Sequence, residues 1–333
     1  MLKTLAQLKN FHIELTTRCN ARCPMCVRNY RGYDYNSGYP VCELSVKDIE
    51  KMFTAEVIAQ LGTRSVNFNG NLGDFSNARD GVEIVKFFLN NKFTVNINTN
   101  GSTRSAEWWS QLAMPGVSIG FAIDGLADTH SLYRQDTDWH KIIENAQAYI
   151  SAGGAAVWRF VPFDHNRHQE QACMDMARDM GFKRFENIYD GRDRGPVYTR
   201  DGSFSHWLGP AEPHAPALKD MLQSHVTWFR AETVNSPKDM LNITYHCQHK
   251  RAQEIYIAAD GSVYPCCYLG FYPGQMAHPG NEQLLPLVRE NNALEYGLEH
   301  SMAWFDSVEA TWSKPSIRNG RLYQCVNSCG AAQ

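Results

Sequence analysis

The residues best able to do chemistry in this sequence are its ten cysteines, most of which fall into two groups. In the first group, Cys19, Cys23 and Cys26 have the spacing C-x3-C-x2-C and follow the predicted strand Phe11–Thr17. Three thiolates at this spacing can hold three irons of a [4Fe–4S] cluster and leave the fourth iron open to a small chelating molecule. The open iron predicts a reactive cluster rather than one that only carries electrons.

The second group lies toward the carboxyl end and comprises Cys247, Cys266, Cys267, Cys325 and Cys329. In a small secreted protein such clustering would predict disulfides, but this chain is long and shows no export signal, which favours metal or cluster ligands. A hairpin is predicted around Asp260-Gly261, between residues 253–258 and 262–266, and it would bring Cys247 and Cys266 to one end. Because neighbours on a strand point to opposite faces, only one of Cys266 and Cys267 should be a ligand.

Composition narrows the function classes further. The 333 residues carry 32 Lys+Arg and 35 Asp+Glu, for a formal net charge of -3, so the chain lacks the basic excess of a nucleic-acid or membrane-surface protein. No apolar run approaches the roughly 20 residues that span a bilayer, and residues 1–17 lack the apolar region of a signal peptide. We therefore expect a cytoplasmic protein with no nucleic-acid or membrane partner.

The elements that must position the first cysteine group alternate between strands and helices as far as about Tyr189. Predicted strands cover residues 11–17, 65–69, 93–98, 117–123, 155–161 and 183–187, and predicted helices cover residues 45–61, 78–91, 103–112, 139–152 and 166–181. This alternation predicts an α/β fold with a parallel sheet and helices on its outer face. Polar residues follow several strands at their carboxyl ends, where such sheets carry their chemistry.

The cysteine loop after the first strand of a (βα)6 pattern resembles the radical S-adenosylmethionine (radical SAM) superfamily. The resemblance implies a (βα)6 partial TIM barrel over residues 1–190, with a [4Fe–4S] cluster and SAM as cofactors. In that family the open iron binds the amino and carboxylate groups of SAM. One electron from the cluster then cleaves SAM to methionine and a 5′-deoxyadenosyl radical, which takes a hydrogen atom from the substrate. The chain departs from the family at Met25, where an aromatic residue is usual.

The same resemblance assigns residues to the SAM site. The segment from Asn69 to Asp74 takes the place of the family's Gly-Gly-Glu-Pro motif, which receives the SAM ammonium group; the usual Glu and Pro are absent. Arg134 is the candidate partner of the SAM carboxylate, and Ala122 replaces a Ser common among relatives. The expected cofactor-binding residues are Met25, Asn69, Gly70, Asn71, Gly73, Asp74, Asn100, Ala122, Arg134 and Val161.

The carboxy-terminal part, residues 242–333, resembles the auxiliary-cluster domains called SPASM and twitch, through the spacing C-x13-G-x4-C that ends at Cys266. The resemblance implies a small β-hairpin/α domain in which Cys247, Cys266, Cys325 and Cys329 hold a second [4Fe–4S] cluster. SPASM needs seven cysteines and only five follow residue 240, so twitch fits better. A four-cysteine zinc site remains the alternative. Cys42 and Cys173 are predicted to be small buried residues, although a role for Cys42 near the substrate stays open.

These observations predict a radical SAM enzyme, oxidoreductase-like, whose auxiliary cluster assists a net oxidation or a cross-linking of a small molecule or a short peptide. Residues 191–241 would connect the two units, and an external one-electron donor such as flavodoxin or ferredoxin would be required. The alternative is a non-catalytic Fe–S electron carrier or a zinc-bound scaffold. The sequence leaves open the substrate, the bond formed, whether SAM is consumed or regenerated, and the oligomeric state.

Overall fold

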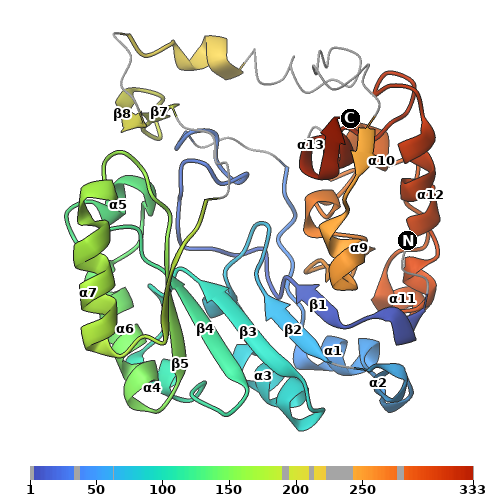
Figure 1. Ribbon diagram of the computed structural model, residues 1–333, viewed down its shortest axis with the longest axis horizontal. Coiled ribbons are helices and arrows are strands. Elements are labelled where there is room, and N and C mark those ends of the chain that lie inside the picture. Colours follow the sequence, from blue (N-terminus) through green and yellow to red (C-terminus); the bar gives the residue numbers. More distant parts are fainter. Residues whose placement is uncertain are drawn as a thin grey trace.

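A single eight-stranded sheet organises the computed structural model, which describes residues 4–33, 38–62, 64–189, 195–209, 214–222, 243–275 and 281–332. The strand order is β11-β10-β1-β2-β3-β4-β5-β6 (Figure 1). Neighbouring strands from β1 to β6 pair in parallel, in chain order, so the predicted strand–helix alternation and the α/β fold class are confirmed. The parallel strands are β1 (Asn10–Ile13), β2 (Ser65–Phe68), β3 (Thr94–Thr99), β4 (Val117–Ala122), β5 (Ala155–Phe160) and β6 (Arg184–Asn187).

Helices cover the outer face of this sheet. They are α1 (Val46–Met52), α2 (Ala55–Gln60), α3 (Gly81–Asn90), α4 (Ala106–Ser110), α6 (Trp139–Ser151) and α7 (Glu170–Met180). The short helix α5 (His130–Tyr133) instead packs beside the cysteine loop, with Tyr133 in the same cluster as Cys23. Ser45 and Asp48 form a reciprocal cap at the start of α1. The prediction of one helix over residues 45–61 was wrong, because the Thr54 side chain accepts a hydrogen bond from the Val57 N–H and so begins a second helix.

The two faces of the sheet differ in chemistry because side chains alternate along each strand. On the helix-covered face, Phe53, Phe88 and Phe93 form a cluster of rings whose centroids lie 5.0 to 6.1 Å apart. The opposite, concave face carries polar side chains, among them Asn67 and Asn98, and holds a cavity of about 400 Å³. An apolar layer therefore stabilises the sheet from outside and leaves its concave face for ligands.

The carboxy-terminal unit extends the same sheet. The predicted hairpin forms as β10 (Glu254–Ile257) and β11 (Val263–Tyr264), with Gly261 at a φ of +86 in the turn. Strand β10 pairs in parallel with β1, so this unit is joined to the barrel through backbone hydrogen bonds. Its other elements are β9 (Ile243–Tyr245), α9 (Gln248–Ala252), α10 (Asn281–Leu284), α11 (Ala293–Tyr296), α12 (Phe305–Ala310), α13 (Tyr323–Cys329) and β12 (Gly330–Ala332).

Between the two units, strands β7 (Gly195–Tyr198) and β8 (Phe204–Leu208) form an antiparallel hairpin. Val197 and Leu208 are fully buried in a cluster with Ala21 and Cys23, so the hairpin packs against the first cysteine loop. Three other parts of the predicted connecting region, residues 191–194, 210–213 and 223–241, lie outside the described residues. None of the described helices is long and apolar enough to cross a membrane.

Replacing Phe88 by Ala should lower the free energy of unfolding by about 3–5 kcal/mol, because the substitution empties the centre of the aromatic cluster. Phe88 is fully buried and its ring lies 5.0 Å from Phe93 and 5.1 Å from Phe53. Urea unfolding followed by circular dichroism measures the loss. Phe204→Ala is the control, since Phe204 is 45% exposed and should change stability by less than about 1 kcal/mol. Equal losses in the two variants would contradict this account of the core.

Candidate functional site

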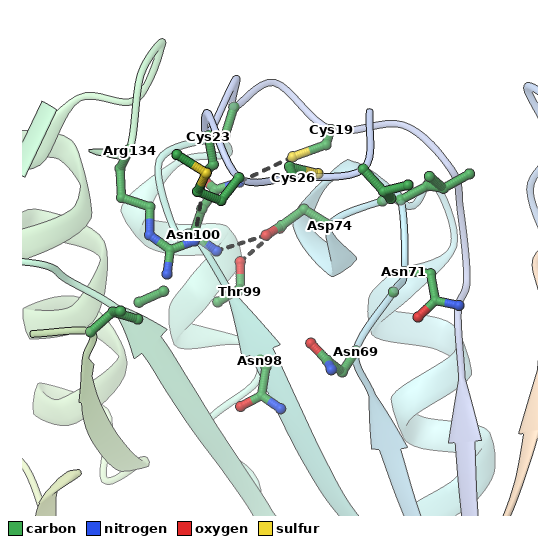
Figure 2. Close-up of a pocket in the computed structure, with 18 of the residues that line it drawn as sticks. Cys19, Cys23, Cys26, Asn69, Asn71, Asp74, Asn98, Thr99, Asn100 and Arg134 are labelled. Carbon is green, nitrogen blue, oxygen red and sulfur yellow. Dashed lines mark hydrogen bonds between the residues drawn. The ribbon is translucent and has the colours of Figure 1, made fainter. Parts of the chain in front are cut away.

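A cavity of about 540 Å³ lies at the carboxyl ends of the parallel strands (Figure 2). The loop after β1 and the ends of β2 to β5 form its wall. The structure brings together in this wall every residue that the sequence assigned to the first cluster and to the cofactor: Cys19, Cys23, Cys26, Met25, Asn69, Gly70, Asn71, Gly73, Asp74, Asn100, Ala122, Arg134 and Val161.

The three cysteines sit together at one end of this cavity, as Figure 2 shows. Burial, and then the nearby groups Asp74, Cys23 and Cys26, raise the pKa of Cys19. Two N–H donors face the sulfurs: Asn100 Nδ2 lies 3.7 Å from Cys19 Sγ, and Arg134 Nη1 lies 3.7 Å from Cys23 Sγ. Three thiols with N–H donors behind them and open space in front fit a cluster with one open iron.

Asp74 holds this end of the cavity in place. Its carboxylate is 7% exposed; Oδ1 accepts from the Ser76 N–H, the Ser76 hydroxyl and the Thr99 hydroxyl, and Oδ2 accepts from the Asn100 N–H at 2.7 Å. Its own N–H donates to the Arg18 carbonyl, next to Cys19, at 3.0 Å. Its four hydrogen bonds give Asp74 a positioning role between three loops, and its contact with the ammonium group of SAM stays a prediction.

The turn after β2 needs its glycines. A Cβ on Gly73 would lie 1.6 Å from the Thr16 carbonyl oxygen, so no side chain fits there. Asn71 Nδ2 donates to the carbonyls of Cys267 and Gly270 at 2.8 and 2.9 Å, which ties the turn to the carboxy-terminal unit. Its amide therefore joins two parts of the fold as well as lining the cavity.

Arg134 lines the cavity and is held from behind by a buried carboxylate. Its Nε donates to Asp124 Oδ2 at 2.6 Å, and Asp124 is fully buried. Burial lowers the pKa of Arg134, but the nearby groups Asp124 and Cys23 raise it by more, so the guanidinium stays charged. The geometry presents a fixed positive charge beside Cys23, and the pairing of Arg134 with the SAM carboxylate stays a prediction.

Two parts of the wall were missed by sequence reasoning. Arg159 Nη1 donates to Asn98 Oδ1 across Gly120, where a Cβ would lie 2.6 Å from the arginine side chain. These three residues separate the upper cavity from the polar cavity on the concave face, because they line both. Tyr268 and Phe271 come from the carboxy-terminal unit and add an aromatic rim. Contacts of this kind join segments that lie far apart in the sequence, so no local motif predicts them.

The four carboxy-terminal cysteines predicted as ligands also converge. Cys325 and Cys329 lie four residues apart on α13 and so share one face of the helix. The His246 N–H, next to Cys247, donates to the Cys329 carbonyl at 2.9 Å, and a hydrogen bond with the Cys329 thiol lowers the pKa of Cys247. Burial raises the pKa of Cys266, and the neighbouring thiols Cys267, Cys325 and Cys247 raise it further, so Cys266 lies near this group.

Two buried donors lie near this group: the hydroxyl of Tyr245, which has no acceptor among the described residues, and the indole N–H of Trp312, and their rings stack at 4.8 Å. Burial raises the pKa of Cys325 to about 11, although a hydrogen bond from the Trp312 indole lowers it in part. Sulfur atoms of a cluster would accept from such donors, so the surroundings fit a closed, four-thiolate [4Fe–4S] group.

Cys267 faces a different environment from Cys266. Burial raises the pKa of Cys267, but hydrogen bonds with His12 and His249 lower it more, to about 7. His249 in turn bonds Glu254 at 2.7 Å. Cys267 therefore belongs to a histidine cluster, which leaves Cys266 as the candidate for the fourth ligand.

The geometry also bears on the zinc alternative. Among the residues that the structure describes, no three His, Cys, Asp or Glu side chains converge closely enough to hold a single metal ion. A four-iron cluster separates its thiolates more widely, because each one binds a different iron.

Comparison with known proteins agrees with this geometry. Residues 13–172 match the family model described as the Radical SAM superfamily, so this part of the chain is a domain of that superfamily. None of the curated proteins matches the sequence.

The solved structures that resemble this chain share its fold. SuiB of Streptococcus suis bound to S-adenosylmethionine has 13% identity and a TM-score of 0.54, over 96% of this chain and 77% of that chain. The protein anSMEcpe with bound AdoMet has 16% identity and a TM-score of 0.53, over 97% of this chain and 87% of that chain. The prediction of a partial barrel followed by a carboxy-terminal unit is thereby confirmed.

Replacing Asp74 by Asn should lower the free energy of unfolding by about 1–3 kcal/mol, because the new NH2 group must face one of the four donors. Urea unfolding of the apoprotein measures this effect. Asp175→Asn is the control, since Asp175 makes an exposed pair with Arg178 and should contribute less than about 1 kcal/mol. An unchanged stability in Asp74→Asn would refute the positioning role.

Replacing Cys266 and Cys267 by Ala, one at a time, tests which of the two binds the second cluster. Cys266→Ala should remove about four irons per chain after anaerobic reconstitution, whereas Cys267→Ala should retain them, because only Cys266 faces the other three thiols. Iron and sulfide analysis gives the count. The reverse pattern would assign the cluster to Cys267.

Proposed function

We propose that this chain is an enzyme that binds SAM at a [4Fe–4S] cluster held by Cys19, Cys23 and Cys26, and uses it to take a hydrogen atom from a substrate. The single observation that carries the proposal is the cavity of about 540 Å³ in which these thiols meet all ten predicted cofactor residues. An electron carrier needs no such space beside its cluster, so the cavity argues against the non-catalytic alternative.

When bound and reduced, the cluster would supply one electron to SAM, which separates into methionine and a 5′-deoxyadenosyl radical. The residues of this chain would hold the cluster and bind SAM next to it. Cys19, Cys23 and Cys26 leave the cavity side of the site open, and Arg134 supplies a fixed positive charge beside the thiolates. The turn from Asn69 to Gly73 offers close backbone approach and amide oxygens for the ammonium group. Val161 and Tyr133 supply apolar wall, which suits the adenine.

The carboxy-terminal thiols support a second role. Cys247, Cys266, Cys325 and Cys329 together can saturate a [4Fe–4S] cluster, which disfavours direct substrate binding to it. Such a cluster can accept the electron that a substrate radical loses, so that the substrate undergoes a net two-electron oxidation or a cross-linking. An external one-electron donor of the flavodoxin or ferredoxin class would reduce the first cluster.

The substrate is proposed to be a small molecule or a peptide. Structures of similar fold include SuiB bound to the precursor peptide SuiA, at 14% identity and a TM-score of 0.54 over 96% of this chain and 76% of that chain. In this chain, Tyr268 is 44% exposed and lines the cavity together with Phe271, which gives an extended ligand an aromatic surface at the mouth.

The central experiment is anaerobic reconstitution followed by reduction with dithionite in the presence of SAM. We expect about eight irons per chain and formation of 5′-deoxyadenosine. Cys23→Ala should abolish 5′-deoxyadenosine formation, because it removes a ligand of the SAM cluster, and should leave about four irons in the second site. Chromatography of the quenched reaction measures the product.

Cys42→Ala is the matched control, since Cys42 does not line the cavity. It should retain both the iron content and SAM cleavage. Cleavage that persists in Cys23→Ala would sink the proposal. Zinc in place of iron, with no cleavage in the unaltered protein, would favour the scaffold alternative.

A further inference from the structure

A buried carboxylate outside the predicted site, Glu14, connects the cavity to the carboxy-terminal unit. Glu14 is 1% exposed and follows β1 directly. Its Oε1 accepts from the Leu72 and Gly73 N–H groups at 2.6 and 2.9 Å, and its Oε2 accepts from the Tyr256 and Tyr272 hydroxyls at 2.9 and 2.5 Å. The carboxylate is thus held by two pairs of donors from opposite sides.

These donors belong to segments far apart in the sequence. Leu72 and Gly73 lie in the turn after β2 that lines the cavity, and Tyr256 lies on β10. Tyr272 comes from the loop that also supplies Phe271 to the rim. Because β1 pairs with β2 on one side and with β10 on the other, the end of β1 is where these segments meet.

No cation neutralises Glu14 within the described residues, since no Lys, Arg or His makes an ion pair with it. Its charge is stabilised by hydrogen bonds alone, and in a poorly screened interior each one contributes more than it would in water. Loss of one donor therefore weakens a network rather than a single contact.

The turn after β2 is pressed closely against this carboxylate. A Cβ on Gly70 would lie 2.5 Å from Glu14 Oε1. The Leu72 and Gly73 amides point their positive ends at Glu14, and so away from a ligand in the cavity. The carboxylate behind the turn also attracts positive charge, since few solvent molecules screen it. Both effects favour an ammonium group at this part of the wall.

We propose that Glu14 is a positioning residue for the amino-acid end of SAM, and that Tyr256 and Tyr272 make the shape of this subsite depend on the docked carboxy-terminal unit. The inference rests on the proposed function, because it concerns the same cavity. It adds a residue that touches neither the cluster loop nor the cavity and still determines how SAM binds.

The test uses the full chain after anaerobic reconstitution, in three variants. Glu14→Gln removes the charge and keeps one acceptor oxygen, and Tyr272→Phe removes one donor without changing the ring. Tyr264→Phe is the matched control, because Tyr264 is 3% exposed on the adjacent strand β11 but its hydroxyl does not bond Glu14. SAM affinity is measured by calorimetry, and the electron paramagnetic resonance spectrum of the reduced protein is recorded with and without SAM.

We expect Glu14→Gln to bind SAM about tenfold or more weakly, which is the scale for lost hydrogen bonds to a charged group. Tyr272→Phe should weaken binding by a smaller factor, and Tyr264→Phe should match the unaltered protein. In Glu14→Gln the spectral change on adding SAM should shrink while the iron content stays the same.

The outcomes separate the two proposals. If the unaltered protein cleaves SAM but Glu14→Gln binds it with the same affinity, the inference is overturned and the proposed function stands. A lower melting temperature without a change in affinity, or an equal loss in Tyr264→Phe, would also overturn it. Absence of SAM cleavage in the unaltered protein would instead refute the proposed function.

Discussion

The arrangement of the site depends on the hydrogen bonds of one buried carboxylate, Asp74. Strands β1, β2 and β3 all end at the same edge of the sheet, where Asp74 forms hydrogen bonds with the loop that follows each of them. Its carboxylate accepts from Ser76, Thr99 and Asn100, and its N–H donates to the Arg18 carbonyl. The hydrogen bond from the Asp74 N–H to the Arg18 carbonyl therefore links the cysteine loop to the ends of β2 and β3. A buried acceptor with four partners is costly to disrupt, so the geometry of the loops is set together.

The sheet itself makes room for this site by separating its two faces. Apolar side chains under the helices form an aromatic core around Phe88, while the concave face keeps polar side chains such as Asn67 and Asn98. The hairpin of β7 and β8 then closes over the cysteine loop, with Val197 and Leu208 buried against Cys23. A cluster on this loop would be shielded on one side by apolar contacts and open to the cavity on the other.

The carboxy-terminal unit shares the main sheet with the barrel and contributes to the wall of the cavity. Strand β10 pairs with β1, and Tyr268 completes the rim of the cavity. The Asn71 side chain donates hydrogen bonds to two backbone carbonyls of that unit, and Glu14 accepts hydrogen bonds from two of its tyrosine hydroxyls. The wall of the cavity and the carboxy-terminal unit are therefore joined by hydrogen bonds and by strand pairing.

The sequence by itself determined the order of parallel strands and the cysteine loop, because periodicity, caps and cysteine spacing are local signals, whereas the residues around that loop were predicted through the resemblance to the radical SAM family. It also predicted the hairpin at Gly261, but not that the hairpin would join β1. Only the tertiary structure decided which of Cys266 and Cys267 faces the other thiols, that Arg134 pairs with Asp124, and that Glu14 joins two units. Each of these outcomes depends on contacts between residues distant in sequence, and such contacts leave no pattern in the chain until the sheet has formed.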